Sequence, residues 1–362
     1  MQKTTHNKYL FILNIMAEKH EKETIASLGE FGLIDKLTAD FQNKQVSTLK
    51  GVGDDAAVIS CGDHCMVVTT DMLIEGIHFN LMYVPMKHLG YKSVIVNLSD
   101  ICAMNAIPRQ ITVSLAVSAK FTLAAIEELY EGIRLACEKY GVDLVGGDTT
   151  SSLTGMVISI TALGTALPEE LTYRAGARPG NLLCVTGDLG GAYMGLQLLE
   201  RENEVFKVHP GTQPRLEGYD YILQRQLKPE ARSDITEALK KLKIKPTSMI
   251  DISDGLSSEI LHLCKASRTG CKLYEEKIPF DQQTRDMALE FNINPLVSAL
   301  NGGEDYELLF TIPVEDYPKV KDDPDISVIG HITQPEEGAM LATTGGSLIP
   351  LQAQGFNHMQ GH

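Results

Sequence analysis

Short segments rich in aspartate recur along this chain, each beside an apolar run of the kind that forms a buried strand or helix. In the stretch 51–79, Asp54 and Asp55 precede one such run, while Thr69, Thr70 and Asp71 close another. Neighbouring carboxylates repel each other, and burying them unpaired costs free energy. We therefore expect the two segments to lie at neighbouring strand ends and to share a divalent cation. Aspartates that merely mark turns are the alternative.

The pattern continues through the rest of the chain, where further aspartates lie beside Gly, Ser or Thr. The loop carboxylates that it assigns to one site are Asp54, Asp55, Asp71, Asp100, Asp148, Asp251 and Asp254. Oxygen ligands without His or Cys select hard cations, above all Mg²⁺, and adjacent glycines let backbone amides approach phosphate oxygens. Phosphoryl transfer needs positioning and metal clamps more than covalent work from the protein. The pattern favours an enzyme that handles ATP or a similar polyphosphate, with unrelated turn and cap aspartates as the alternative.

Familiar nucleotide-binding sequences are absent from the chain. It contains no G-x-x-x-x-G-K-[ST] and no H-R-D or D-F-G set. The glycines at 187–191 do not have the G-x-G-x-x-G spacing, so we expect them to allow close helix packing instead. An ATP-dependent enzyme of a less common type remains.

Composition narrows the partners and the compartment. The 362 residues are enough for two domains, and the net charge of −15 argues against nucleic acid or an anionic membrane as the main partner. The seven cysteines are odd in number and form no CxxC pair, which fits free thiols in a reducing cytoplasm. The apolar run 9–16 is too short to span a membrane and lacks a cleavage site. We expect residues 1–27 to be an extension of unknown role, either frayed or a leader ahead of a true start at Met16.

Periodicity predicts an α/β chain of two domains. Helices are expected over 28–41, from 85 to about 100, and over 123–140, where apolar residues recur at helical spacing and Gly141 ends the pattern. Strands are expected over 111–117, 142–145, 156–163, 182–185 and 308–312, and the segment 200–232 is a candidate mobile loop with a helix. A turn-rich segment near 167–180 marks the boundary between domains 28–166 and 167–362.

Six motifs carry a resemblance to a known family. They are GVGDDAAV, TTDMLIEGIHF, NLSDICAM, LVGGDTT, ISDGLSSEI and GGEDYELLF. With these motifs the chain resembles, from about residue 29 to 358, the thiamine-monophosphate kinases, which belong with aminoimidazole ribonucleotide synthetase and selenophosphate synthetase. The aspartate loops suit the whole superfamily, whereas TTD…GIHF together with GGEDYEL is more specific to the kinases.

The resemblance implies transfer of the γ-phosphate of ATP to thiamine monophosphate, giving thiamine diphosphate. It implies that several Mg²⁺ ions are held by Asp54, Asp55, Thr69, Thr70, Asp71, Asp100, Asp148, Asp251 and Asp254, with Asp55 favoured over Asp54. It implies that ATP is contacted by Tyr130, Gly147, Asp148, Arg174 and Ser253. It also implies that the thiamine moiety is held by His78, Glu304 and Phe356. No general base or covalent nucleophile stands out, so we expect no catalytic residue beyond the metal ligands.

Each transferred role has a structural alternative: Tyr130 falls on or beside the buried stripe of its helix, and a lone histidine such as His78 is more often structural. Asn105 stands where the family usually has Gly, and Asn tolerates a positive φ.

The family also implies an N-terminal domain that pairs with its twin in a dimer-spanning β-barrel, and a C-terminal α/β domain. Sister enzymes of the superfamily and a noncatalytic metal- or nucleotide-binding module are the competing functions. No reactive cysteine occurs before Cys61, and the chain does not end in Cys, which argues against selenophosphate synthetase and hydrogenase-maturation relatives.

Overall fold

The computed structural model describes residues 25–353, which fall into two units that are considered separately: 25–42 and 43–353. In the first unit, α2 (Ile25–Thr38) is broken at Gly29, where φ is 65°. This helix begins and ends three residues before the predicted range of 28–41. At its end the Thr38 hydroxyl donates to the carbonyl of Ile34 at 2.7 Å.

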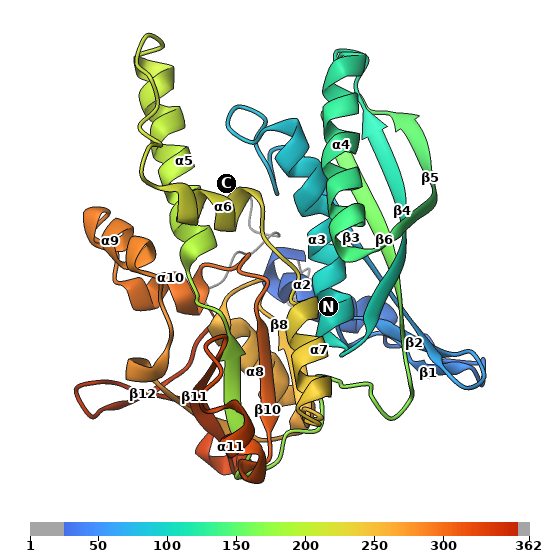
Figure 1. Ribbon diagram of the computed structural model, residues 1–362, viewed down its shortest axis with the longest axis vertical. Coiled ribbons are helices and arrows are strands. Elements are labelled where there is room, and N and C mark those ends of the chain that lie inside the picture. Colours follow the sequence, from blue (N-terminus) through green and yellow to red (C-terminus); the bar gives the residue numbers. More distant parts are fainter. Residues whose placement is uncertain (1–24, 354–362) are drawn as a thin grey trace, which may run out of the picture. The chain divides into compact units, whose positions relative to one another are not determined.

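The second unit contains two sheets (Figure 1). The first is six-stranded with the order β1-β2-β3-β6-β4-β5, and only its β4–β5 pair is parallel. Its strands are β1 (Thr48–Lys50), β2 (Ala57–Ser60), β3 (Cys65–Ile74), β4 (Ile107–Val117), β5 (Asp143–Ser151) and β6 (Val157–Ala166). The predicted strands of this sheet are shorter than the observed ones and lie within their bounds, apart from Val142 and Met156, which directly precede β5 and β6.

Alternation along these strands separates an inner from an outer face. Along β6, buried residues alternate strictly with partly exposed ones, and the same period of two places Thr69 and Asp71 of β3 on the inner face. The prediction that Asp71 closes a strand is wrong, because the alternation continues to the buried Leu73 and β3 pairs with β6 through Ile74. The prediction that Asp148 lies in a loop is also wrong, since β5 continues through it in parallel register with β4.

Two helices cover the inner face, as Figure 1 shows: α3 (Met86–Ala103) lies against the sheet and α4 (Leu123–Tyr140) against α3. They approach closely because Gly90 and Gly132 have no side chains; a Cβ on either would come within 1.9 Å of a carbonyl oxygen of the other helix. The predicted bounds of α4 are confirmed, with Thr122 as its N-cap and Gly141 in the left-handed conformation after it.

Asp100 lies inside α3 and not at its boundary, contrary to the prediction that this helix ends near residue 100. The helix continues because Ile101, Cys102 and Ala103 add a fully buried turn. The turn that follows has Asn105 at φ 55°, and its side-chain amide donates to the carbonyl of Glu170 at 2.9 Å. The expectation that Asn can replace Gly in this turn is confirmed.

The second sheet has seven strands in the order β13-β12-β9-β11-β7-β10-β8, antiparallel except between β9 and β12. Its strands are β7 (Leu182–Thr186), β8 (Ser248–Asp251), β9 (Gly270–Tyr274), β10 (Leu308–Ile312), β11 (Ile326–Thr333), β12 (Ala339–Ala342) and β13 (Leu348–Pro350). β8 forms one edge, and α3 contacts it. Helix α3 thus contacts strands of both sheets, and the candidate site lies where it does so.

Helices of the second half surround this sheet or extend from it. They are α5 (Gly191–Val208), α6 (Asp220–Leu227), α7 (Ser233–Lys241), α8 (Leu256–Ser267), α9 (Gln282–Glu290), α10 (Pro295–Asn301), α11 (Tyr317–Val320), and the short η1 (Glu275–Lys277), η2 (Val314–Asp316) and η3 (Pro335–Glu337). The segment predicted as loop plus helix over 200–232 is mostly helical, because α5 continues to Val208 and α6 follows.

The glycines near 190 serve close packing, as predicted: a Cβ on Gly190 would lie 2.5 Å from the Ser298 hydroxyl oxygen, and one on Gly195 would lie 2.1 Å from the Ile222 carbonyl oxygen. All seven cysteines are free thiols. Between residues 25 and 353, every helix is too short or too polar to traverse a lipid bilayer. The domain boundary near residue 167 falls between the two sheets and stays a prediction.

Candidate functional site

Three carboxylates from distant parts of the chain come together. Asp55, Asp100 and Asp251 each offer an oxygen, and these oxygens all lie within 4.8 Å of one another. Asp55 follows β1 in a loop, Asp100 lies in the last turn of α3, and Asp251 ends β8. The contact of α3 with both sheets therefore assembles the carboxylate cluster, as we call these three residues.

Hydroxyl groups hold two members of the cluster in place. The Thr69 hydroxyl donates to Asp100 Oδ2 at 2.6 Å, and the Ser99 hydroxyl donates to Asp251 Oδ2 at 2.5 Å. Asp55 differs, because its Oδ2 is buried without a hydrogen-bond partner among the described residues. A buried carboxylate oxygen without a partner suits a cation ligand.

The cluster is electrostatically unfavourable as it stands. Burial raises the pKa of Asp55 to about 7, although Arg174 lowers it, and Asp251 and Asp54 raise it further. Burial likewise raises the pKa of Asp251 to about 6 and that of Asp100 well above its ordinary value, the latter with added repulsion from Asp71. Desolvation and like charge both favour protonation, so the site favours either protons or an added cation.

Arg174 brings one cation to the cluster. Its Nε and Nη2 donate to Asp55 Oδ1 at 3.1 and 2.7 Å, and its backbone N–H donates to Asp54 Oδ1 at 3.0 Å. Lys50 pairs with the other oxygen of Asp54 at 3.0 Å. Asp54 Oδ2 accepts no hydrogen bond but has the Lys50 ammonium as an ion-pair partner, whereas Asp55 Oδ2 has no partner of either kind among the described residues.

The other predicted ligands separate into two groups. Asp71 and Asp254 lie close enough to raise the pKa of Asp251, and the backbone N–H of Asp71 donates to the Asn97 amide oxygen at 3.0 Å. The structure does not bring Thr70 and Asp148 to the cluster: the Thr70 side chain is on the outer face, where its hydroxyl donates to the Ile160 carbonyl, and the register of β5 puts Asp148 on that face too. The reason is the strand period of two, which turns alternate residues away from α3.

One of the predicted thiamine residues lines a small pocket, and a second contacts residues that line it. His78 lines it, and its Nδ1 accepts from the Ile74 backbone N–H at 3.0 Å. Glu304 holds two other lining residues: its Oε1 pairs with Lys92 Nζ at 2.8 Å, and its Oε2 accepts from Gln226 Nε2 at 2.9 Å. Phe356 lies outside the described residues.

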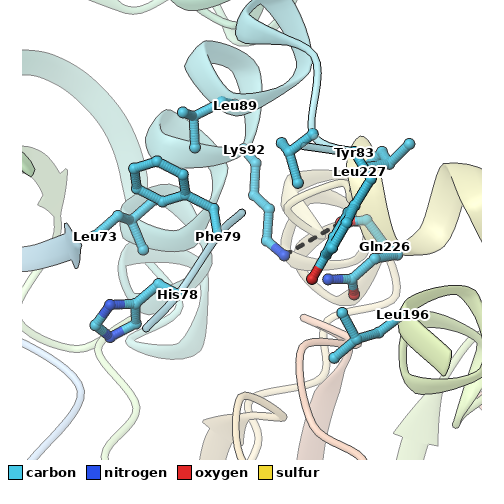
Figure 2. Close-up of a pocket in the computed structure, with 10 residues that line it drawn as sticks. Leu73, His78, Phe79, Tyr83, Leu89, Lys92, Leu196, Gln226 and Leu227 are labelled. Atoms are coloured by element: carbon cyan, nitrogen blue, oxygen red, sulfur yellow. Dashed lines mark hydrogen bonds between the residues drawn. The ribbon is translucent and has the colours of Figure 1, made fainter. Parts of the chain in front are cut away.

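Figure 2 shows this pocket, with Lys92 between a wall that holds His78 and Phe79 and an opposite wall that holds Tyr83 and Gln226. Burial raises the pKa of Tyr83 to about 12, so its hydroxyl stays neutral at physiological pH. Most other lining residues are leucines.

The predicted nucleotide residues also divide. Tyr130 of α4 is partly buried and packs against the core, and it lines a second pocket that reaches Leu144 of β5. Gly147 and Asp148 lie on this same exposed strand. Arg174 is instead at the carboxylate cluster, and Ser253 follows β8, where its carbonyl accepts from the Glu304 backbone N–H at 2.7 Å.

Four residues of the site were missed from the sequence. Ser99 and Glu259 support Asp251 and Asp254, the latter through the Asp254 backbone N–H, which donates to Glu259 Oε1 at 2.9 Å. Lys92 and Gln226 form the polar end of the pocket. A lysine within the apolar run of α3 was the one available signal, since a buried lysine needs a partner.

Comparison with known proteins agrees with the fold. A family model described as the N-terminal domain of AIR synthase related protein matches residues 53–166, which contain β2 to β6 of the first sheet and both covering helices. The N-terminal half thus has the fold of the AIR synthase related class, and the predicted α/β fold is confirmed, while the dimer-spanning barrel stays a prediction.

Relatives over nearly the whole chain specify the family. The thiamine-monophosphate kinase of Aquifex aeolicus is 33% identical over 334 residues, which cover 92% of this chain and 99% of the relative. That of Bacillus subtilis is 31% identical over 340 residues, covering 92% and 100%. A solved structure described as AaThiL complexed with AMPPCP and TMP is 31% identical, with a TM-score of 0.79 and coverage of 94% and 100%. The chain belongs to the thiamine-monophosphate kinase family.

Proposed function

We propose that this protein transfers the γ-phosphate of ATP to thiamine monophosphate, forming thiamine diphosphate and ADP. The observation that carries the proposal is the carboxylate cluster, in which three acidic groups lie within 4.8 Å of one another. The names of the relatives support it, as does the solved relative with AMPPCP, an ATP analogue, and TMP. An acidic site that binds two anionic substrates requires cations.

The donor set of the cluster fits Mg²⁺. All its donors are carboxylate oxygens, the ligands that Mg²⁺ prefers, and Asp55 Oδ2 has no other partner among the described residues. Asp55, Asp100 and Asp251 would hold the metal, with Asp54, Asp71, Asp254 and the Thr69 hydroxyl nearby as the further predicted ligands. When bound, Mg²⁺ ions neutralise phosphate charge and stabilise the transferring phosphoryl group.

The residues of the chain then position and orient the substrates. The Arg174 guanidinium already faces the cluster, and its fork of donors suits a phosphate oxygen once Asp55 is neutralised. Ser99 and Thr69 fix the directions of two carboxylates. His78 and Glu304 position the thiamine moiety at their pocket.

The acceptor needs no general base from the protein. A phosphate monoester has a second pKa of about 6, so its oxygen is already anionic at pH 7. We therefore propose direct in-line transfer without a phosphorylated enzyme. Trapping of a covalent phosphoprotein during turnover with labelled ATP would contradict this.

A homodimer is the second part of the proposal. Within residues 43–353, no helix covers the outer face of the first sheet, which presents Thr70, Met72, Ser159, Thr161, Ser114 and Asp148. All nine residues of the edge strand β5 are exposed. An uncovered sheet face and an unpaired edge both favour association, and a barrel formed with a second copy would cover them. We place the protein in the cytoplasm, which suits its seven free thiols.

The test is coupled release of ADP with Mg-ATP and thiamine monophosphate, with product identified by chromatography. We expect thiamine diphosphate, and no turnover with aminoimidazole precursors, the substrates of a sister enzyme. Asp71→Asn is expected to abolish turnover with an unchanged circular dichroism spectrum. Absence of thiamine diphosphate from the wild type would overturn the proposed function, and wild-type turnover by Asp71→Asn would remove Asp71 from the metal site.

A further inference from the structure

The end of α6 and the segment that leads into α7, residues 225–232, form a connection that we call the strap. Within it, the Glu230 carboxylate contacts the two helices that cover the first sheet. Its Oε2 accepts from the Tyr91 hydroxyl of α3 at 2.6 Å and from the Tyr140 hydroxyl of α4 at 2.7 Å. Its Oε1 pairs with Lys139 Nζ of α4 at 2.7 Å. One carboxylate thus fastens the strap to both helices.

The surroundings of Glu230 strengthen this attachment. Burial and the hydrogen bond to Glu230 raise the pKa of Tyr91 and of Tyr140 above the usual value, so both hydroxyls stay protonated and donate. The Tyr140 hydroxyl oxygen also accepts from the Ala231 backbone N–H at 2.9 Å. The Lys228 ammonium lies 4.9 Å from the centre of the Tyr91 ring. Hydrogen bonds to an ionised group are about twice as strong as neutral ones, so the strap is held firmly against α3 and α4.

The strap also contacts the turn 303–306, which precedes β10. The Gln226 side-chain N–H donates to Glu304 Oε2 at 2.9 Å, and the Arg225 guanidinium donates to the backbone carbonyl of Asp305 at 3.2 Å. Glu304 is one of the residues predicted to hold the thiamine moiety. Its position relative to α3 and α4 therefore depends on where the strap lies.

The turn needs such outside contacts because its backbone is strained. Gly303, Glu304 and Tyr306 have φ values of 71°, 60° and 52°. Residues other than glycine adopt this left-handed region at a cost, and stay there only where neighbouring contacts hold them. The Glu304 backbone N–H donates to the Ser253 carbonyl at 2.7 Å, and that of Tyr306 to the Ile252 carbonyl at 2.8 Å. The loop after β8 thus holds the backbone of the turn, and the strap contacts the Glu304 side chain.

We propose that Glu230 is a positioning residue for thiamine monophosphate: by fastening the strap to α3 and α4, it sets the place of the Glu304 side chain. The inference rests on the proposed function, in which Glu304 holds the thiamine moiety. Among the described residues, the hydrogen-bond and ion-pair partners of Glu230 lie on α3 and α4, outside the carboxylate cluster. Loosening the strap therefore weakens the binding of thiamine monophosphate and leaves ATP binding and the transfer step unchanged.

The test is steady-state kinetics of the full-length enzyme with Mg-ATP and thiamine monophosphate. For Glu230→Ala we expect KM for thiamine monophosphate to rise about tenfold, the effect of about one hydrogen bond, with kcat and KM for ATP within about twofold of the wild type. Glu230→Gln keeps an oxygen that accepts from both tyrosines, so its KM should return most of the way to the wild-type value. Tyr91→Phe removes one of the two donors and should show the same selective rise at smaller size, which provides a second variant if Glu230→Ala is insoluble.

Glu170→Ala is the matched control. The Glu170 side chain is 29% exposed, as is that of Glu230, and it pairs with Lys240 of α7 at 2.6 Å, outside the strap. We expect this variant to leave both KM values unchanged. KM does not depend on the amount of enzyme, so partial loss of folded protein does not alter it.

Three results would overturn the inference. They are an unchanged KM for thiamine monophosphate in Glu230→Ala, an equal rise in both KM values, and a Glu230→Gln variant as impaired as Glu230→Ala. A wild type that forms no thiamine diphosphate would instead overturn the proposed function, and this inference with it.

Discussion

The two groups of buried charge in this molecule are built in opposite ways. The carboxylate cluster brings three acids together, with Arg174 paired to one of them. A second group, the ionic network, lies in the second half and contains Arg225, Arg232, Asp305 and Glu307. The buried members of the network are two acids and two bases, and Arg232 also pairs with the exposed Asp234 and Asp325. The buried cluster has three acids and one base.

The contacts show the same difference. Glu307 Oε1 accepts from Arg225 at 2.8 Å, and its Oε2 accepts from Arg232 and from the Thr186 hydroxyl, each at 2.5 Å. Asp305 accepts from the Gly190 backbone N–H at 2.7 Å at the start of α5. In the cluster, by contrast, Asp55 keeps an oxygen with no partner. Charges paired within the chain serve the fold, while unbalanced charges require a ligand.

The largest expected effect is on activity at the cluster. Asp100→Asn removes one metal ligand, so we expect turnover to fall about a thousandfold, as for loss of a preorganised electrostatic group. Because it also removes repulsion from Asp71, Asp251 and Asp55, the metal-free protein should melt at a higher temperature than the wild type. Steady-state kinetics and thermal unfolding in a chelator measure both. A variant that is active, or less stable without metal, would contradict an excess of negative charge at this site.

The ionic network should respond in the opposite direction. Arg225→Met leaves Glu307 and Asp305 with one less cation, and we expect a loss of about 3–5 kcal/mol in the free energy of unfolding, as for breaking a buried pair. Urea unfolding measures it. Arg134→Gln, which breaks exposed pairs with Glu131 and Glu138, is the control and should change stability little. Equal losses in the two variants would mean that the network is no more than a surface ion pair.

Within the adjacent pair, the two aspartates should differ. Asp55→Asn is expected to lower kcat/KM far more than Asp54→Asn, for which we expect about a tenfold loss, because Asp54 is held by Lys50 and the Arg174 backbone. Kinetics at saturating Mg²⁺ compare them. Equal losses of kcat/KM in the two variants would indicate that both carboxylates bind metal. They would contradict the conclusion that Asp54 is held by the protein while Asp55 is available to a cation.

The smallest effect is on the melting temperature as pH changes. The pKa values of Asp55 and Asp251, about 7 and about 6, are raised above the unfolded value. Their contribution to stability is therefore present below pH 4 and is lost as pH rises through 6 to 7. Mg²⁺ requires the deprotonated carboxylates, so its stabilisation should grow from near zero at pH 5 to about 5 °C at pH 8. Paired scans with and without Mg²⁺ isolate this term. Stabilisation that is independent of pH would contradict it.

The sequence was informative where local patterns determine structure. Helix α4 was predicted to the residue because its apolar stripe and Gly141 stop agree, and the structure adds Thr122 as its N-cap. Asp71 and Asp148 were misplaced because polar residues at the end of an apolar run indicate a loop, whereas strand pairing continued the strands through both. The strand period then separated Thr70 from Thr69, which no motif indicates.

Contacts between distant segments could not be predicted. The meeting of Asp55, Asp100 and Asp251 follows from α3 reaching the edge strand β8, a packing that neither segment encodes alone. Gln226 lies in a stretch that seemed only polar, and its role depends on Glu304, 78 residues away. The motifs thus suggested a set of residues for one site, and the fold determined which of their side chains come together there.

The most direct measurement is a crystal structure with Mn²⁺ and a nonhydrolysable ATP analogue, using anomalous scattering to locate the metal. We predict an anomalous peak coordinated by at least two of Asp55, Asp100 and Asp251, and none in the ionic network. Mn²⁺ bound with the nucleotide elsewhere, with the three carboxylates still directed at one another and no metal between them, would contradict the conclusion that their excess charge serves the metal.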